Sequence, residues 1–364
     1  MTVLAMSAVL AIGQEEEEED LDLSLSLWDK SITLRGALGY KDNVLLSSAH
    51  PEGSAFWQTA LDVTVFRLSL DGGVNFTYFL TAEDRRYFSS DEIEKEQLLL
   101  TQAKLEKPIG DDWVASATLQ YLYADQVYDA SATELILETL PVKSHNVQFS
   151  PGITRNLPWN SALELKFTLE RQYFNEPLDD YWEYGPQLAF TKKYGNRSEA
   201  SLSYTFDQRE YDQRREVDLD FFAVEGTSLA YEQHEFEFDL NHSWDEERRW
   251  RSRLRFVFEL NDDNATGFYD YNRYRLSKRF GYYAENWQAT VEGKILHYDY
   301  DRQPVFEGTG IRSTWEYVLA GHDHKRIWKQ MNIFADTEYD IAESNYALEE
   351  YTVWTLMGGI DWEF

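Results

Sequence analysis

Charged side chains occupy alternate positions in three stretches in the second half of the sequence. The first stretch is acidic and holds Glu235, Glu237 and Asp239. The other two are mainly basic. One holds Arg251, Arg253 and Arg255, with Glu259 at the same parity, and the other holds Arg273, Arg275 and Arg279. Residues two apart in a β-strand point to the same face of a sheet, so each stretch would present a row of like charges. Such rows can attract or repel ions and charged solutes according to their sign.

The acidic stretch is expected to lie beside the arginine stretches, because they follow one another in the chain. Opposite charges on neighbouring strands stabilise a sheet by about 0.2–1 kcal/mol per pair. The arginines outnumber their nearby carboxylate partners, and arginine stays protonated at physiological pH. We therefore predict that several guanidinium groups face water and form a permanent positive stripe.

A further acidic group lies in the segment 124–143. Its carboxylates are Asp125, Asp129, Glu134 and Glu138. The same segment holds four large aliphatic residues, Leu135, Ile136, Leu137 and Leu140. A solvated loop has little use for four such side chains so close together. The sequence thus predicts a long connection that packs against another part of the protein.

The histidines form no catalytic or metal-binding motif. His242 and Ser243 are adjacent, and adjacent residues on a strand point to opposite faces, so they cannot act together as base and nucleophile. His322 and His324 fall in a predicted turn, and two histidines alone make a poor metal site. No phosphate-binding loop or metalloprotease motif occurs. We therefore expect neither an enzyme nor a bound metal or cofactor.

Long antiparallel strands must position these charges, because alternating segments recur from residue 31 to residue 364. From Trp354 to Phe364, one set of alternate residues is mainly aromatic or aliphatic and the other is mostly polar or small. Roughly sixteen such segments can be distinguished, each about ten residues long. A change of phase after Val65 predicts a β-bulge in the second segment.

The predicted connections alternate between short and long. The short ones are 71–73, 107–111, 156–160, 194–197, 245–248, 281–286 and 322–325. The long, polar ones include 42–54, 81–94, 124–143 and 207–233. Alternation of short and long connections along the chain is typical of a transmembrane β-barrel, in which one side carries tight turns and the other carries long loops.

Composition narrows the class of protein further. The chain has 34 basic and 65 acidic residues and a formal net charge of −31, so a nucleic-acid partner is not expected. It has no cysteine, which excludes disulfides and thiolate metal sites. No run of apolar residues is long enough for a membrane-spanning helix. Aromatic residues nevertheless make up 16% of the chain, a combination that fits a barrel with a polar lumen and aromatic girdles.

The sequence predicts three parts. Residues 1–13 include a short apolar stretch that looks like a signal peptide, although no lysine or arginine precedes it. Residues 14–30 begin with a run of acidic residues and are predicted to be a solvated periplasmic tail. Residues 31–364 show no linker or change of composition, so we predict one all-β domain, a closed antiparallel meander. Closure is required because lipid offers no hydrogen-bond partners to a free sheet edge.

The closing segment resembles the last strand of Gram-negative outer-membrane β-barrels, in which a terminal phenylalanine belongs to the signal read by the barrel-assembly machinery. This resemblance implies that Phe364 and Trp362 form an assembly signal. It also implies an outer-membrane location, with lipid, lipopolysaccharide and the assembly machinery as partners, and a possible homo-oligomer. The segment Gly39-Tyr40-Lys41-Asp42-Asn43 is similar to the opening of some β-barrel porins and surface-lipoprotein assembly barrels.

The chain also resembles sixteen-stranded general porins, in which the third extracellular loop folds into the pore. The segment 124–143 is the third long connection here. The resemblance implies that its four carboxylates form the acidic side of a constriction, opposite the arginines, although general porins place their basic cluster on early strands. The alternative is an outer loop packed on its neighbours, with lumen charges that only pair with one another.

These observations together predict a passive aqueous channel for small hydrophilic solutes or ions. The acidic excess favours a mild preference for cations, unless the arginines control the narrowest point. Two alternatives remain: a barrel that exports polysaccharide or a surface protein, and an outer-membrane hydrolase.

Overall fold

A computed structural model describes most of the chain. The described residues are 27–48, 50–69, 72–90, 92–129, 139–195, 197–220, 222–305, 310–346 and 349–364. The predicted signal-peptide-like segment 1–13 and most of the predicted tail 14–30 lie outside them. No described helix is long and apolar enough to cross a membrane.

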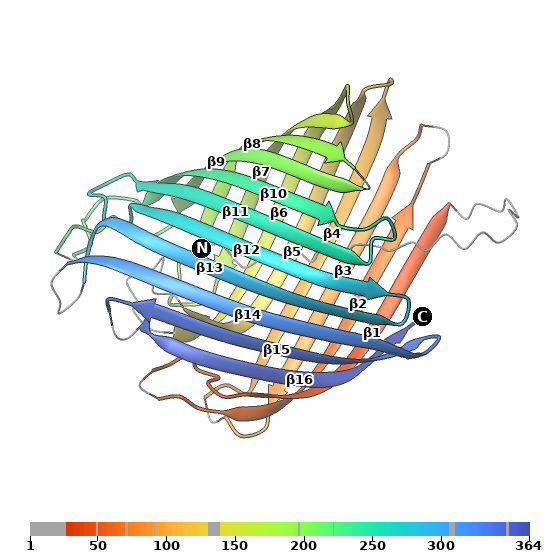
Figure 1. Ribbon diagram of the computed structural model, residues 1–364. Helices are drawn as coiled ribbons and strands as arrows, with labels where there is room; N and C mark the ends of the chain where they lie inside the picture. The colour runs from red at the N-terminus through yellow and green to blue at the C-terminus, as the bar shows by residue number, and fades with distance from the viewer. Residues whose placement is uncertain are drawn as a thin grey trace, which may run out of the picture.

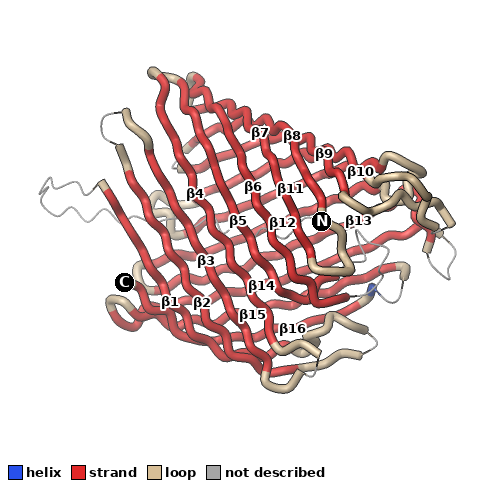
Figure 2. Tube along the Cα trace, turned by 180° about the vertical axis from the view of Figure 1, so that it is seen from behind, coloured by secondary structure: helices blue, strands red, loops and turns tan. Residues whose placement is uncertain are grey.

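Sixteen antiparallel strands form one closed barrel in chain order, and β1 pairs with β16 (Figures 1 and 2). This confirms the predicted fold class. The strands are β1 (Trp28–Lys41), β2 (Ser54–Arg67), β3 (Asn75–Tyr87), β4 (Lys95–Ile109), β5 (Trp113–Asp129), β6 (Thr139–Leu157), β7 (Ser161–Phe174), β8 (Tyr181–Tyr194), β9 (Ser198–Tyr211), β10 (Ala230–Ser243), β11 (Trp250–Asp263), β12 (Tyr271–Ala284), β13 (Trp287–Pro304), β14 (Ile311–Trp328), β15 (Met331–Ser344) and β16 (Tyr351–Glu363).

The two ends of the barrel carry different connections. One end, called here the turn end, carries 68–74, 110–112, 158–160, 195–197, 244–249, 285–286 and 329–330. The other, called the loop end, carries 42–53, 88–94, 130–138, 175–180, 212–229, 264–270, 305–310 and 345–350. Gly110 supplies a positive φ of 65° in one of the tight turns, a conformation that glycine adopts without steric cost. The last residue lies at the turn end (Figure 1).

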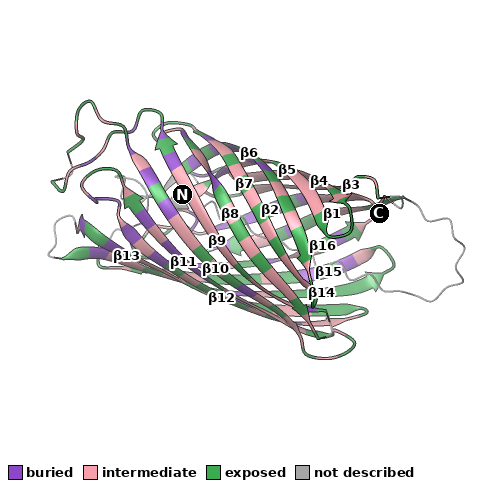
Figure 3. Cartoon of the chain, turned by 90° about the horizontal axis from the view of Figure 1, so that it is seen from above, coloured by how far each residue is buried: buried purple, intermediate pink, exposed green. Residues whose placement is uncertain are grey.

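Exposed and less exposed residues alternate along many of the strands (Figure 3), as expected where successive side chains point to opposite faces of the wall. In the middle of β7 the outward residues are apolar and 39–52% exposed, namely Leu163, Leu165, Phe167 and Leu169. The residues between them are polar or charged, such as Glu164 and Lys166. A water-soluble sheet would pack its apolar face against a core. This barrel instead turns its apolar face outward.

The tryptophans mark the outer face most clearly. All twelve are exposed by at least 37%. Eight lie near the turn end, namely Trp28, Trp113, Trp159, Trp244, Trp250, Trp287, Trp328 and Trp362. The other four, Trp57, Trp182, Trp315 and Trp354, lie towards the loop end. Two bands of amphipathic rings that flank an apolar belt are the arrangement found where a barrel crosses the two interfaces of a bilayer.

The strands extend further than the sequence predicted. Segments 81–94 and 207–233 contain loops only at 88–94 and 212–229. The predicted turn 322–325 is wrong, since β14 continues to Trp328 and the turn is at 329–330. One cause explains all these differences in the strand ends. Strand pairing continues beyond the apolar belt, where residues on both faces are polar and the sequence therefore resembles a loop. β1 likewise begins at Trp28, inside the segment predicted as a tail.

The predicted bulge in the second segment is also wrong. The register of β2 with β1 runs without interruption from Lys41 opposite Ser54 to Trp28 opposite Arg67. Its register with β3 is equally regular. Phe66 therefore points inward near the turn end, and no extra residue shifts the strand.

Candidate pore lining

The predicted acidic stretch and the arginine stretches lie on the inner face of neighbouring strands. On β10 they alternate with Phe236 and Phe238, which are exposed on the outer face. On β11 and β12 the inner arginines alternate with outward residues such as Phe256 and Leu276. The fold thus brings these stretches together, as alternation and chain order predicted. That the acidic and arginine stretches line an aqueous pore stays a prediction.

Ion pairs run across the inner face of β10, β11 and β12. Arg253 Nε lies 2.7 Å from Asp239 Oδ2, and Arg255 Nη2 lies 2.6 Å from Glu237 Oε2. Arg273 pairs with Glu259, and it also lies 3.5 Å from Glu235 Oε2. Every predicted carboxylate of β10 therefore has an arginine partner. We call the inner face of β10–β13 the paired wall.

Most arginines of the predicted stripe have a carboxylate partner, so the predicted excess of unpaired guanidinium groups is wrong, while their exposure to water stays a prediction. Arg275 Nη2 lies 3.9 Å from Glu235 Oε2, and Arg279 Nη2 lies 2.5 Å from Glu292 Oε2 on β13. Arg251 is the exception: it donates to the backbone carbonyl of Arg248 at 2.7 Å and lies over the ring of Tyr283. The sequence predicted Glu259 on the inner face but not its pairing with Arg273, and Glu292 was missed. These two carboxylates bring the number of partners close to that of the arginines.

The inner face of β5 and β6 has the opposite character, and we call it the uncharged wall. In the described part of these strands, the inward positions hold no acidic or basic residue. They hold hydroxyl, amide and small apolar side chains, for example Ser116, Thr118 and Gln120. Hydrogen bonds continue onto β7, where Thr168 Oγ1 lies 3.2 Å from Ser150 Oγ. This wall offers donors and acceptors without a net charge.

A second acidic row, which the sequence analysis missed, lies on the inner face of β15. It consists of Asp336, Glu338 and Asp340, which alternate as the residues of β10 do. Glu316 on β14 acts electrostatically on Asp340. His322 Nδ1 lies 3.1 Å from Asp336 Oδ1, on the inner face of β14 rather than in a turn. The signal was present in the sequence as Asp-x-Glu-x-Asp.

The predicted constriction residues do not form an infolded loop in the described part of the chain. Asp125 and Asp129 belong to β5, which pairs with β6 up to Asp129 opposite Thr139. Asp125 shares its face with the exposed residue Leu119, and thus points outward. There it lies 3.8 Å from Lys95 Nζ and 3.6 Å from Lys143 Nζ. The remaining two, Glu134 and Glu138, lie outside the described residues.

The connection that does pack inward is 212–229, between β9 and β10. Val217 and Leu229 are buried with Phe268 of the connection 264–270. This cluster also contains the inward tyrosines of β8, β9 and β10, namely Tyr181, Tyr211 and Tyr231. Its hydrophobic residues occupy the inner side of the loop end, so the barrel mouth is narrowed over these strands.

Arginines hold this mouth cluster in place. The guanidinium of Arg209 lies 4.4 Å from the ring centroid of Tyr181 and 2.5 Å from Glu183 Oε2. Arg214, on the connection itself, lies over the rings of Tyr211 and Tyr269. Outside the barrel wall, hydrogen bonds from Arg171 hold the pKa of Asp212 below its usual range. These contacts fix the connection to both faces of the sheet.

The residues considered for hydrolysis lie apart from one another. His242 faces outward and Ser243 faces inward. A different serine, Ser198, has its Oγ 3.4 Å from His242 Nδ1, but it is only 2% exposed. No group of acidic, histidine or cysteine residues in the described ranges could hold a metal ion.

The sequence matches no protein-family model and no curated protein. Three solved structures have a similar chain path. OccAB1 from Acinetobacter baumannii is 8% identical, with a TM-score of 0.49 over 93% of this chain and 97% of that chain. An anion-selective porin from Comamonas acidovorans is 10% identical, with a TM-score of 0.48 over 93% and 99%. OprD from Pseudomonas aeruginosa is 10% identical, with a TM-score of 0.45 over 92% and 95%.

Proposed function

We propose that this protein is a passive channel of the outer membrane, through which small hydrophilic solutes or ions diffuse. The observation that supports this best is the division of one closed wall into two faces. The outer face carries most of the large apolar residues and the tryptophans of the strands, while the inner face carries most of the charged and amide residues.

The outer face supports a location in the membrane. Lipid cannot satisfy free backbone groups, and a closed barrel leaves none along its wall. Two bands of tryptophan anchor such a wall at the two interfaces. The Gram-negative outer membrane is the bilayer in which barrels of this kind with an apolar outer face occur.

The inner face supports passive permeation. A barrel of sixteen strands is wide enough to leave a water-filled lumen. The paired wall holds its charges in fixed positions, so it contributes dipoles with little net charge. The acidic row of β15 has fewer cationic partners among the described residues than the paired wall has, and we therefore propose a mild preference for cations. Pore-lining roles follow for Glu235, Glu237 and Asp239 and for the arginines of β11 and β12.

Single-channel recording on purified protein in planar lipid bilayers tests this function. We expect stable conductance steps that grow linearly with voltage, since the inner face is rigidly paired. Removal of residues 216–226, which belong to the inward-packed connection, should raise the conductance. A wild-type protein that is silent, and that conducts only after this removal, would contradict the channel and favour a plugged exporter.

Catalysis is not part of the proposal. A hydrolytic serine must be accessible and hydrogen-bonded to a base that a third group orients. Ser198 is buried beside His242, and Ser243 points to the other face. Lipid hydrolysis that disappears in a His242→Ala variant would overturn this assignment.

A further inference from the structure

One lysine interrupts the apolar outer face in the middle of a strand. Lys278 lies at the centre of β12 (Tyr271–Ala284), exposed between the outward residues Leu276 and Phe280. The other outward-facing charged residues of the described strands lie nearer to a strand end. A charged side chain held in hydrocarbon destabilises a barrel, most strongly at the midplane, unless it reaches a polar partner.

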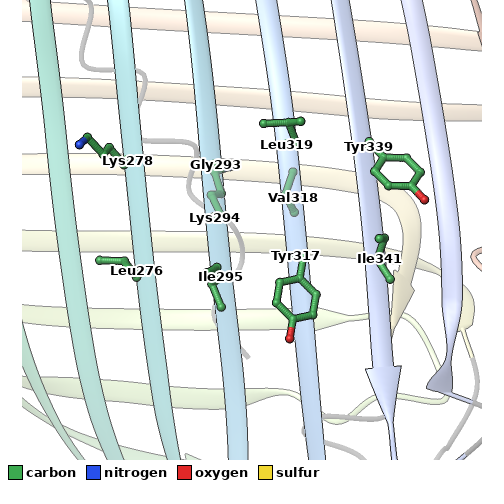
Figure 4. Close-up of a pocket in the computed structure, with 10 residues that line it drawn as sticks. All are labelled: Leu276, Lys278, Gly293, Lys294, Ile295, Tyr317, Val318, Leu319, Tyr339 and Ile341. Atoms are coloured by element: carbon green, nitrogen blue, oxygen red, sulfur yellow. The ribbon is translucent and has the colours of Figure 1, made fainter.

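A hollow of about 340 Å³ opens in the outer face beside this lysine (Figure 4). It follows two rows of residues that pair across four strands. One row is Lys278, Gly293, Leu319 and Tyr339, and the other is Leu276, Ile295, Tyr317 and Ile341. Gly293 leaves the floor open, since a Cβ placed there would meet no atom within 4 Å. The lining is apolar, and Lys278 is the outward-facing cation at its edge. Lys294 and Val318 also border the hollow but belong to the inner face by their register.

The order of these rows along the barrel indicates how a ligand would lie. β12 runs from the loop end to the turn end, so Leu276 and its row lie deeper in the membrane than Lys278 when approached from the turn end. Tyr282 follows four residues after Lys278 and packs against Trp250 and Trp287 in the aromatic band of that end. At about 3.3 Å per residue and a strand tilt of about 40°, that band is about 10 Å from Lys278. An extended lysine side chain covers more than half of this distance.

We propose that the hollow binds one acidic phospholipid of the leaflet at the turn end, which is the periplasmic leaflet in the function proposed above. An acyl chain that enters from the turn end passes Lys278 and ends in the space over Gly293. The lysine amine extends towards the interface and pairs with the lipid phosphate. Lipid from the opposite leaflet would place its chain ends, not its phosphate, beside the lysine.

A second copy of this chain fits the site less well. It would have to bring a carboxylate to the middle of the apolar belt. On the described strands the outward carboxylates, such as Asp84, Asp125 and Asp323, lie towards strand ends. A phosphate supplied by the bilayer meets the charge of Lys278 without this requirement.

Native mass spectrometry of the detergent-purified protein with phosphatidylglycerol or phosphatidylcholine tests the site. We expect the wild type to retain one phosphatidylglycerol about fivefold more strongly than one phosphatidylcholine, the effect of one basic residue near a lipid phosphate. Lys278→Met should abolish the preference. Gly293→Leu, which fills the hollow and keeps the lysine, should weaken retention of both lipids. Lys107→Met removes an exposed lysine from the outer face of β4 and should leave the preference unchanged.

Equal retention of the two lipids by the wild type, or an unchanged preference in Lys278→Met, would overturn the proposal. So would a protein dimer that the wild type forms and Lys278→Met loses, because that result would place a second copy on this face. Conductance recorded on the same variants separates the two proposals. Lys278→Met and Gly293→Leu should conduct as the wild type does, whatever their lipid binding, since neither side chain faces the lumen.

Discussion

The paired wall of β10–β13 and the uncharged wall of β5–β6 share one backbone geometry and differ in almost everything else. In both, residues alternate between a mainly apolar outer face and a mainly hydrophilic inner face. The paired wall holds arginines and carboxylates at contact distance, such as Arg253 and Asp239. The uncharged wall holds hydroxyl and amide groups. The barrel fold therefore requires a hydrophilic inner face, but it does not determine whether that face carries charged or uncharged side chains.

The difference also predicts where the barrel tolerates change. A buried ion pair that loses one partner leaves an uncompensated charge, which costs far more than a lost hydrogen bond between neutral groups. In the paired wall, removal of one partner of an ion pair should therefore lower the free energy of unfolding strongly, and removal of both partners should lower it little. In the uncharged wall, both single and double substitutions of hydrogen-bonding residues should have small effects on the free energy of unfolding.

The largest effect is expected for Glu259→Gln. The side chain of Arg273 is 3% exposed, and Glu259 is its nearest carboxylate, with Glu235 Oε2 at 3.5 Å. Loss of this partner should lower the free energy of unfolding by about 3 kcal/mol. The matched change on the uncharged side is Ser150→Ala, which removes the hydrogen bond with Thr168 and a longer one from Gln148 Nε2, and should cost about 1 kcal/mol. Urea unfolding in lipid vesicles, followed by tryptophan fluorescence, measures both. Equal losses would remove the distinction between the walls.

A smaller effect is expected on ion selectivity. Arg255→Gln leaves Glu237 without its partner at 2.6 Å, so the reversal potential in a salt gradient should shift towards cations. The double variant Glu237→Gln with Arg255→Gln removes both charges and should restore the wild-type value. A double variant that shifts as far as the single one would show that these charges act separately. The paired description of the wall would then fail.

The smallest effect is expected outside the barrel wall, at the pair of Arg171 and Asp212. Because the arginine lowers the pKa of Asp212, the pair stabilises the fold above the ordinary pKa of an aspartate, and this stabilisation is lost as pH falls through the lowered value. Asp212 is exposed, so solvent screening keeps the contribution below about 0.5 kcal/mol. Asp212→Asn should therefore leave the unfolding midpoint nearly unchanged between pH 5 and pH 8. A large loss would show that this contact stabilises the mouth connection by more than an exposed ion pair can.

Alternation was sufficient to predict the fold, because two-residue periodicity is the direct consequence of a wall between lipid and water. The number of strands, their order and the face of each arginine followed from it. Strand ends did not follow. Beyond the apolar belt both faces meet water, so residues such as His322 and His324 resemble a turn although they lie within β14.

The site was predicted less completely than the fold. Parity placed Glu235, Glu237 and Asp239 beside the arginines, but it gave no pairing distances. Parity also placed Glu259 on the inner face, but its pairing with Arg273 was not predicted, and Glu292 was missed. The inward packing of 212–229 depends on contacts between distant loops, such as Phe268 with Tyr231, which no local pattern encodes. The hypothesis that segment 124–143 folds into the pore failed for Asp125. β5 continues to Asp129, beyond the expected start of the loop, and Asp125 lies on its outer face.

The central claim is that one face of the wall meets water and the other meets lipid, and a cysteine scan tests it most directly. The chain contains no cysteine, so single substitutions along β5 report without background. In liposomes, a small charged thiol reagent should modify cysteines at the inward positions Ser116, Thr118 and Gln120, and lower the conductance of each variant. It should leave cysteines at the outward positions Ala117, Leu119 and Tyr121 unmodified. Equal modification at all six positions, or modification of the outward set alone, would contradict the account.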